Sequence, residues 1–188
     1  MQIFLASRSP RRRELLSAAG IPYACVDGDV DESLPPKVKP VDAVQVLASM
    51  KARKGAEACT SGYVLGADTL VALDEVILGK PRDRADARRM LQQLSGTCHQ
   101  VFTGVALLRV QDGRMLVDHA CTKVHMRVLS AQEIDAYVDS GESDDKAGAY
   151  AIQETADRFV TRLDGAYDNV VGLPVDLVRR MLKDMDLS

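Results

Sequence analysis

The chain has 188 residues, of which 46 % are hydrophobic and 27 % charged, so disorder and low-complexity repeats are excluded and a full core can form without cross-links. A net charge of −3, no tryptophan and 4 % aromatic residues argue against a nucleic-acid-binding surface. No apolar run approaches the ~20 residues that a membrane span needs, and the start lacks the features of a secretory signal. We therefore expect a cytoplasmic protein with no membrane partner and no nucleic-acid partner.

The cysteines and histidines show no pattern of a metal or redox site. No cysteine pair has C-x-x-C spacing, so we expect four reduced, mostly buried thiols. The three histidines fall in predicted strands, without the spacing of metal ligands. These residues are Cys25, Cys59, Cys98, Cys121, His99, His119 and His125.

The first half of the chain alternates short strands and helices. A strand at residues 2–6 precedes a helix from Pro10 to about residue 19, which Gly20 ends. A strand at residues 21–26 leads into an acidic loop, and Pro40 begins a helix that reaches residue 58. The next predicted strands are residues 63–67, 70–73 and 76–78, the last two forming a hairpin.

The second half continues the alternation. Its predicted elements are a helix at residues 83–94, a hairpin of strands 100–110 and 114–128, a short helix behind the capping box of Ser130 and Glu133, a strand at 158–163, and a helix that Pro174 begins. Alternating strands and helices predict an α/β fold with a mixed sheet. We assign the whole chain, residues 1–188, to one domain.

Three arginines, residues 11–13, fill the first turn of the first predicted helix, where the helix dipole favours negative charge. Ser9 is suited to cap this helix and Pro10 to begin it. A solvated basic face is one interpretation of the run. We favour an anion site, most naturally for phosphate, because the run follows a strand and a tight turn at a helix N-terminus.

Carboxylates gather in the loop at residues 27–32, and Asp68 is placed at the end of a predicted apolar strand, where α/β folds hold their ligands. Acidic loops are more often solvated surface than sites. Together with phosphate-binding arginines, however, carboxylates are what metal-assisted hydrolysis of a polyphosphate requires. Gly79-Lys80 is not a P-loop, because Pro81 stands in place of the Ser or Thr.

A third segment, residues 144–153, combines small residues with Gln153, whose amide can donate to and accept from a base edge. A ligand-binding loop and an ordinary loop entering a strand remain equally open from these residues alone.

Motifs along essentially the whole chain resemble the Maf family of nucleoside triphosphate pyrophosphatases. They are LASRSPRRRELL at residues 5–16, LGADT at 65–69, LGKPRD at 78–83, DKAGAY at 145–150 and VGLP at 171–174. The resemblance implies an elongated α/β fold like that of inosine triphosphatases, with a central cleft, a cytoplasmic homodimer, and a divalent cation such as Mg²⁺, Mn²⁺ or Co²⁺. It also implies cleavage of a nucleoside triphosphate to the monophosphate and diphosphate, in the manner of nucleotide-pool sanitation. Arg8 departs from the small or uncharged residue that is usual in the family.

The resemblance also assigns roles to individual residues. Asp68 matches the proton acceptor, and Glu32 with Asp68 would hold the metal. The implied substrate-binding residues are Ser7, Arg11, Arg12, Lys51, Thr69, Lys80 and Gln153.

Three of these positions separate the family's branches. Arg11, Thr69 and Gln153 match the branch that acts on dTTP and UTP, whereas the 7-methyl-GTP branch has Trp, Gln and Glu there. Specificity for 7-methyl-GTP or modified nucleotides is the first alternative. The second is a nucleotide-binding regulator of septum formation without significant turnover.

Overall fold

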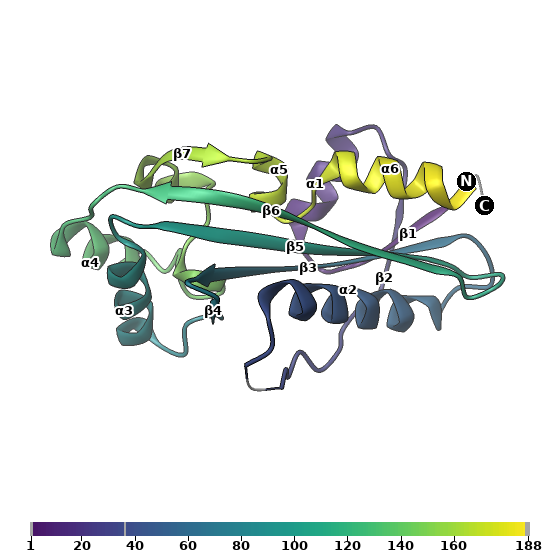
Figure 1. Cartoon of the computed structure of the whole chain (residues 1–188), viewed down its shortest axis with the longest axis horizontal. Helices are drawn as coiled ribbons and strands as arrows, with labels where there is room; N and C mark the ends of the chain where they lie inside the picture. Colours follow the sequence, from purple (N-terminus) through teal and green to yellow (C-terminus); the bar gives the residue numbers. More distant parts are fainter. Residues whose placement is uncertain (1, 36, 187–188) are drawn as a thin grey trace. The chain divides into compact units, whose positions relative to one another are not determined.

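The computed structural model describes residues 2–35 and 37–186, and in this part of the chain the strands form a seven-stranded mixed sheet (Figure 1). The strand order is β2-β1-β3-β5-β6-β7, with β4 paired to β3. β1 is parallel to β2 and β3, whereas β4 on β3 and β7 on β6 are antiparallel. The strands are β1 (Ile3–Ala6), β2 (Ala24–Val26), β3 (Tyr63–Leu73), β4 (Val76–Leu78), β5 (Cys98–Arg109), β6 (Met115–Met126) and β7 (Val160–Asp164). The predicted α/β class with a mixed sheet is confirmed.

The helices of the described residues are α1 (Pro10–Ala18), α2 (Pro40–Ala56), α3 (Arg84–Leu94), α4 (Ala131–Asp139), α5 (Tyr167–Val171) and α6 (Val175–Asp186), with 3₁₀ turns at Ala147–Ala149 and Glu154–Phe159. Their caps agree with the sequence signals. Ser9 and Asp83 cap α1 and α3, and the capping box of Ser130 and Glu133 forms at α4.

The chain divides into two compact units. The first comprises Met1–Asp68, Thr103–Ala120 and Gly172–Ser188, and the second comprises Thr69–Phe102 and Cys121–Val171. β3, β5 and β6 each contribute residues to both units. The assignment of the chain to one functional domain stays a prediction.

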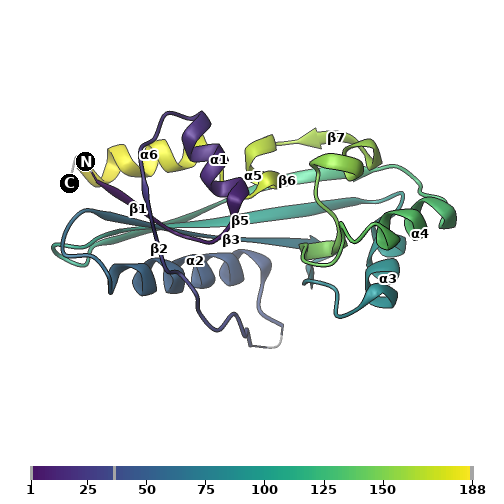
Figure 2. The ribbon, with the colours of Figure 1, turned by 180° about the vertical axis from the view of Figure 1, so that it is seen from behind.

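In the first unit, helices cover both faces of the sheet, with α2 on one face and α1 and α6 on the other (Figures 1 and 2). Alternation along β5 separates the two layers. Ala106 and Leu108 pack with α2, whereas Val105 and Leu107 belong to a core cluster with residues of α1 and α6. β1, β3 and β5 are largely buried on both faces, which explains their nearly continuous apolar sequence.

Helix α2 approaches the sheet closely because glycines face it. A Cβ on Gly66 of β3 would lie 2.2 Å from the carbonyl oxygen of Ala48, and one on Gly104 of β5 would lie 2.2 Å from that of Val44. No side chain fits at such distances, so these two glycines set the spacing between helix and sheet.

The second unit has its own apolar core. Residues of α3 and α4 pack there against β5, β6 and the 3₁₀ turns, and the rings of Tyr137 and Phe159 meet edge to face. His99 and Tyr150 form a second edge-to-face pair, with 2.6 Å between His99 Nε2 and the Tyr150 hydroxyl. Tyr150, from the DKAGAY segment, is therefore held in the core.

Several local expectations need correction. The predicted strand at residues 21–26 forms only at Ala24–Val26, and α5 and the two 3₁₀ turns were not predicted. Cys25, Cys98 and Cys121 are exposed and Cys59 is half-buried, so the expectation of mostly buried thiols is wrong, although all four are free. A three-residue edge strand such as β2 leaves its cysteine outside the core, which sequence hydrophobicity does not reveal.

Candidate active site

Asp68 lies inside β3, not at its end as predicted, because β3 continues to Leu73 and pairs there with β4. The strand that ends beside the site is β1. Its parallel register with β3 stops at Ala6 opposite Gly66, and Ser7 follows directly. Asp68 is thus two residues beyond the last residue paired with β1, at the carboxyl edge of a parallel pair, where α/β sheets place their ligands.

Helix α1 follows β1 after a three-residue turn and presents two buried side chains, Arg12 and Leu16. The two are four residues apart and share one helix face. The backbone N–H of Arg12 donates to Ser9 Oγ at 3.4 Å, and the backbone N–H of Ser9 donates to Ser7 Oγ at 3.1 Å. The predicted turn and the Ser9 cap are therefore formed, and the anion site at this helix N-terminus stays a prediction.

The Arg12 guanidinium points inward instead of into solvent. Its Nε donates to the carbonyl oxygen of Gly172 at 2.8 Å, and its Nη1 donates to Ser7 Oγ at 3.3 Å. Only 9 % of Arg12 is exposed. The interpretation of the arginine run as a solvated basic face is therefore excluded for Arg12, whereas Arg13 is exposed and Arg11 half-buried.

Lys51 joins two carboxylates. Its Nζ lies 2.6 Å from Asp68 Oδ1 and 2.6 Å from Glu32 Oε1. Lys51 and Asp68 are both buried, and Glu32 comes from the half-exposed acidic loop. Asp68 lies two residues beyond Gly66 on the same face of β3, so the close approach of α2 at Gly66 brings Lys51 over Asp68.

Burial changes the pKa values of Asp68 and Arg12. Burial raises the pKa of Asp68, an effect that the cations of Lys51 and Arg12 partly oppose. Burial likewise lowers the pKa of the Arg12 guanidinium, while Asp68 and Glu32 favour its charged form. The result is a carboxylate that is more basic than a surface aspartate, beside two cations.

The acidic loop folds back onto the start of α1. Arg8 Nη2 lies 3.3 Å from Asp27 and 3.4 Å from Asp29, and all three side chains are exposed. Arg8, the departure from the family pattern, therefore forms ion pairs with this loop.

The remaining predicted residues belong to the second unit. Thr69 and Gln153 are half-buried and Lys80 is exposed. The backbone N–H of Gly148 donates to the carbonyl oxygen of Gly79 at 3.0 Å, which brings the LGKPRD and DKAGAY segments together. Arg82 contacts Asp86 at 3.2 Å, so part of the LGKPRD motif anchors the start of α3.

The site suits a hard cation that takes few protein ligands. Among the described residues no group of three or more His, Cys, Asp or Glu side chains could hold a metal ion. Glu32 and Asp68 nevertheless converge on one cationic group, Lys51 Nζ. Mg²⁺ commonly binds through one or two carboxylates together with substrate phosphates, and this donor set fits that pattern.

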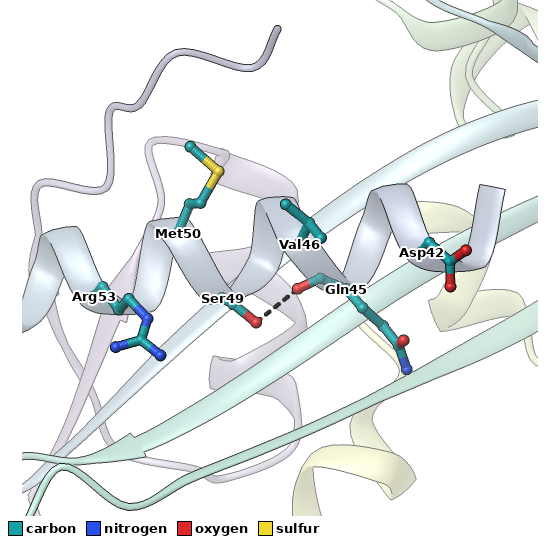
Figure 3. A pocket seen from close by; sticks show the side chains of 6 residues that line it. All are labelled: Asp42, Gln45, Val46, Ser49, Met50 and Arg53. Atoms are coloured by element: carbon teal, nitrogen blue, oxygen red, sulfur yellow. Dashed lines mark hydrogen bonds between the residues drawn. The ribbon is translucent and has the colours of Figure 1, made fainter. Parts of the chain in front are cut away.

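A hollow on the outer face of α2 holds none of the predicted site residues. It is lined by Asp42, Gln45, Val46, Ser49, Met50 and Arg53, as Figure 3 shows. Ser49 Oγ donates to the carbonyl oxygen of Gln45 at 2.7 Å. The exposed side chains of Val46 and Met50 form the apolar part of this surface.

Sequence reasoning missed the carbonyl of Gly172, which accepts from Arg12 across 160 residues of chain. The VGLP motif was noted, but a backbone acceptor leaves no side-chain signal. Gly66 was missed in the same way, since a close approach of backbone is visible only in the folded chain.

Comparison with known proteins identifies a family and named relatives. The family model described as Maf-like protein matches residues 2–185. The dTTP/UTP pyrophosphatase of Pelotomaculum thermopropionicum is 46 % identical over 97 % of this chain and 95 % of its own length. That of Citrifermentans bemidjiense is 49 % identical over 92 % of this chain and 90 % of its own length.

Among solved structures, the Staphylococcus aureus Ham1 protein is similar in fold. The TM-score is 0.56 at 16 % identity, covering 98 % of this chain and 100 % of that chain. At this identity the likeness concerns the fold alone.

Proposed function

Because the chain belongs to the Maf-like family, we propose that it is a nucleoside triphosphate pyrophosphatase that hydrolyses dTTP and UTP. The products are the nucleoside monophosphate and diphosphate. The observation that carries the proposal is the buried cluster of Arg12, Lys51 and Asp68 at the carboxyl end of β1. The names of the relatives, dTTP/UTP pyrophosphatase, support the substrate class.

Asp68 is the proposed general base. Water attacks a phosphorus atom of the α–β phosphoanhydride, and Asp68 accepts the proton that the water loses. The P–O bond between the α- and β-phosphates breaks, so diphosphate leaves the nucleoside monophosphate. A buried carboxylate with a raised pKa is a better base than a surface aspartate, and the neighbouring cation of Lys51 favours its ionised form. Lys51 also fixes the side chain through its contact at 2.6 Å.

Arg12 and Ser7 are the proposed phosphate ligands at the N-terminus of α1. A guanidinium presents its donors in a planar fork that matches phosphate oxygens. The exposed amino group of Lys80 would contribute a further positive charge to the substrate, and Arg11 lies beside Arg12 in the same turn.

A divalent cation is part of the proposal, with Glu32 and Asp68 as its protein ligands. When bound, Mg²⁺, Mn²⁺ or Co²⁺ would neutralise charge on the substrate phosphates. The role of Lys51 is then to balance the two carboxylates before substrate arrives.

Base selection is assigned to Arg11, Thr69 and Gln153. The Gln153 amide can donate to O4 and accept from N3–H, the edge that uracil and thymine share. A pocket that depends on such hydrogen bonds rejects bases that leave its polar groups unpaired.

The cellular location, the oligomeric state and the cellular role are proposed as well. No helix of the described residues is long and apolar enough to cross a bilayer. We propose that the protein is a cytoplasmic homodimer with a role in nucleotide-pool sanitation. Light scattering of the purified protein tests whether it is a dimer.

A diphosphate-release assay tests the function directly. The purified chain is incubated with Mg²⁺ or Mn²⁺ and dTTP, UTP, CTP, GTP or 7-methyl-GTP. Release of diphosphate from dTTP and UTP well above GTP supports the proposal. Preference for 7-methyl-GTP would move the chain to the other specificity, and binding without release would favour the regulatory alternative.

A further inference from the structure

The contact between Arg12 and Gly172 is buried and joins segments far apart in the chain. Arg12 Nε donates to the Gly172 carbonyl at 2.8 Å, the shortest of its described hydrogen bonds. Gly172 itself is buried, at the junction between α5 and α6. A buried carbonyl needs a donor, and a buried guanidinium needs acceptors, so each group satisfies the other.

The backbone at Gly172 has a conformation that favours glycine. Its φ angle is +128°, a region that residues with a side chain rarely adopt. The direction of the Gly172 carbonyl depends on this angle, because φ is the rotation about the N–Cα bond of Gly172 and therefore places its carbonyl carbon. An alanine there would be strained unless φ changes, and a change of φ redirects the acceptor.

The two segments also contribute to one apolar core cluster. Leu16 on α1 and Leu173 are both fully buried in the same core cluster. Arg12 and Leu16 are the two buried residues of α1, and Gly172 and Leu173 are consecutive. The buried face of α1 is therefore joined to this short segment by a hydrogen bond, and one turn later it contributes Leu16 to the core cluster that includes Leu173.

We infer that Gly172 is a positioning residue for phosphate binding: its carbonyl holds Arg12 Nε and so fixes the orientation in which the guanidinium meets the substrate phosphate. An arginine has five N–H donors, and a fork that is already fixed at Nε loses less conformational freedom when it binds phosphate. Gly172 does not touch the substrate. The inference rests on the proposed role of Arg12 as a phosphate ligand.

A double-mutant cycle tests the inference. The dissociation constant for dTTP is measured by calorimetry for the native chain, Arg12→Ala, Gly172→Ala and the double variant, and KM and kcat are measured in parallel. Arg12→Ala should weaken binding roughly 10- to 100-fold, the range for hydrogen bonds to charged groups. Gly172→Ala should weaken it about 10-fold, raising KM more than it lowers kcat. In the Arg12→Ala background, Gly172→Ala should change affinity less than about 2-fold.

The matched control is Gly113→Ala. Gly113 has a φ of +72° with no atom within 4 Å of a Cβ, and it lies in the turn between β5 and β6. Gly113→Ala also places a side chain at a positive φ, so the melting temperature of this variant should fall while its affinity for dTTP stays native. An equal loss of affinity in Gly113→Ala, or additive losses in the cycle, would overturn the inference.

Arg12→Lys covers the case in which Gly172→Ala does not fold. Lysine keeps the charge but has a single nitrogen, which cannot hold the carbonyl and present a fork to phosphate. We expect about 10-fold weaker binding, and native affinity in Arg12→Lys would overturn the inference. Native affinity in Arg12→Ala would instead remove the role of Arg12 on which the inference depends. A native chain that binds dTTP without releasing diphosphate would overturn the proposed activity. The double-mutant cycle would still test the inference, because it compares dissociation constants.

Discussion

Lys51 Nζ contacts Asp68 Oδ1 at 2.6 Å, and both side chains are buried between α2 and β3. Burial raises the pKa of Asp68, and Lys51 is the largest influence that lowers it. The pair thus makes a carboxylate that is more basic than a surface aspartate and whose ionised form is favoured by the neighbouring cation.

Lys51→Met should move the acid limb of the pH–rate profile to higher pH. Activity requires ionised Asp68, so it rises with pH through the pKa of that group, and loss of the neighbouring cation raises the pKa further. The profile of kcat/KM for dTTP is measured from pH 4 to 9. Lys54→Met is the control, because Lys54 lies on the same helix but forms an ion pair with Glu57. An acid limb that stays in place would contradict the assignment of Asp68 as the base.

Asp68→Asn should lower kcat roughly 10²- to 10⁴-fold, the contribution of a general base. The amide keeps the shape of the side chain but cannot accept the proton. Diphosphate release from dTTP is compared with that of Asp42→Asn, an exposed residue of α2. Near-native turnover of a folded Asp68→Asn chain would rule Asp68 out.

Gly66→Ala should destabilise the protein by about 1–3 kcal/mol or more, because its Cβ would meet Ala48 O at 2.2 Å and Ala52 N at 2.6 Å. Displacement of α2 would also separate Lys51 from Asp68, so activity should fall with stability. Gly79→Ala is the control, since no atom lies within 4 Å of a Cβ there. Equal urea midpoints for Gly66→Ala and Gly79→Ala would contradict the prediction, because they would show that α2 accommodates a Cβ at Gly66 without loss of stability.

The stability of the protein should decrease as pH falls from about 6.5 to about 4. Burial lowers the pKa of His99 to about 4, with a smaller effect from His125. In this window the unfolded chain binds a proton that the folded chain does not, which lowers the free energy of unfolding by roughly 3 kcal/mol in total. Urea denaturation at several pH values should show a smaller slope in His99→Gln and a native slope in His119→Gln. An unchanged slope in His99→Gln would assign the effect to other groups.

Native protein should hydrolyse dTTP and UTP far better than GTP or 7-methyl-GTP. The triple variant Arg11→Trp, Thr69→Gln and Gln153→Glu should shift preference toward 7-methyl-GTP, because an indole stacks on a cationic base and a carboxylate faces its charge. Catalytic efficiencies on the four nucleotides provide the comparison. A native preference for 7-methyl-GTP would invalidate the use of these three positions.

Local signals along the chain predicted much of the secondary structure. The capping box at Ser130, the Pro10 start of α1 and the turn at Asp74-Glu75 all depend on residues a few positions apart, and all three are confirmed. The predicted end of the strand before Asp68 was wrong, because the partner β4 that prolongs β3 is a tertiary feature.

The types of residue in the candidate site were likewise evident from the sequence: arginines in a first helical turn, an aspartate after an apolar run, and motifs in the order of a known family. Which arginine turns inward was not evident, since Arg11, Arg12 and Arg13 are chemically alike. The difference arises in the folded chain, where Arg12 is buried with Leu16 and donates to the carbonyl of Gly172. The packing of α2 against Gly66 buries Asp68, raises its pKa and brings Lys51 into contact with it. Such packing between distant segments is a property of the folded chain alone.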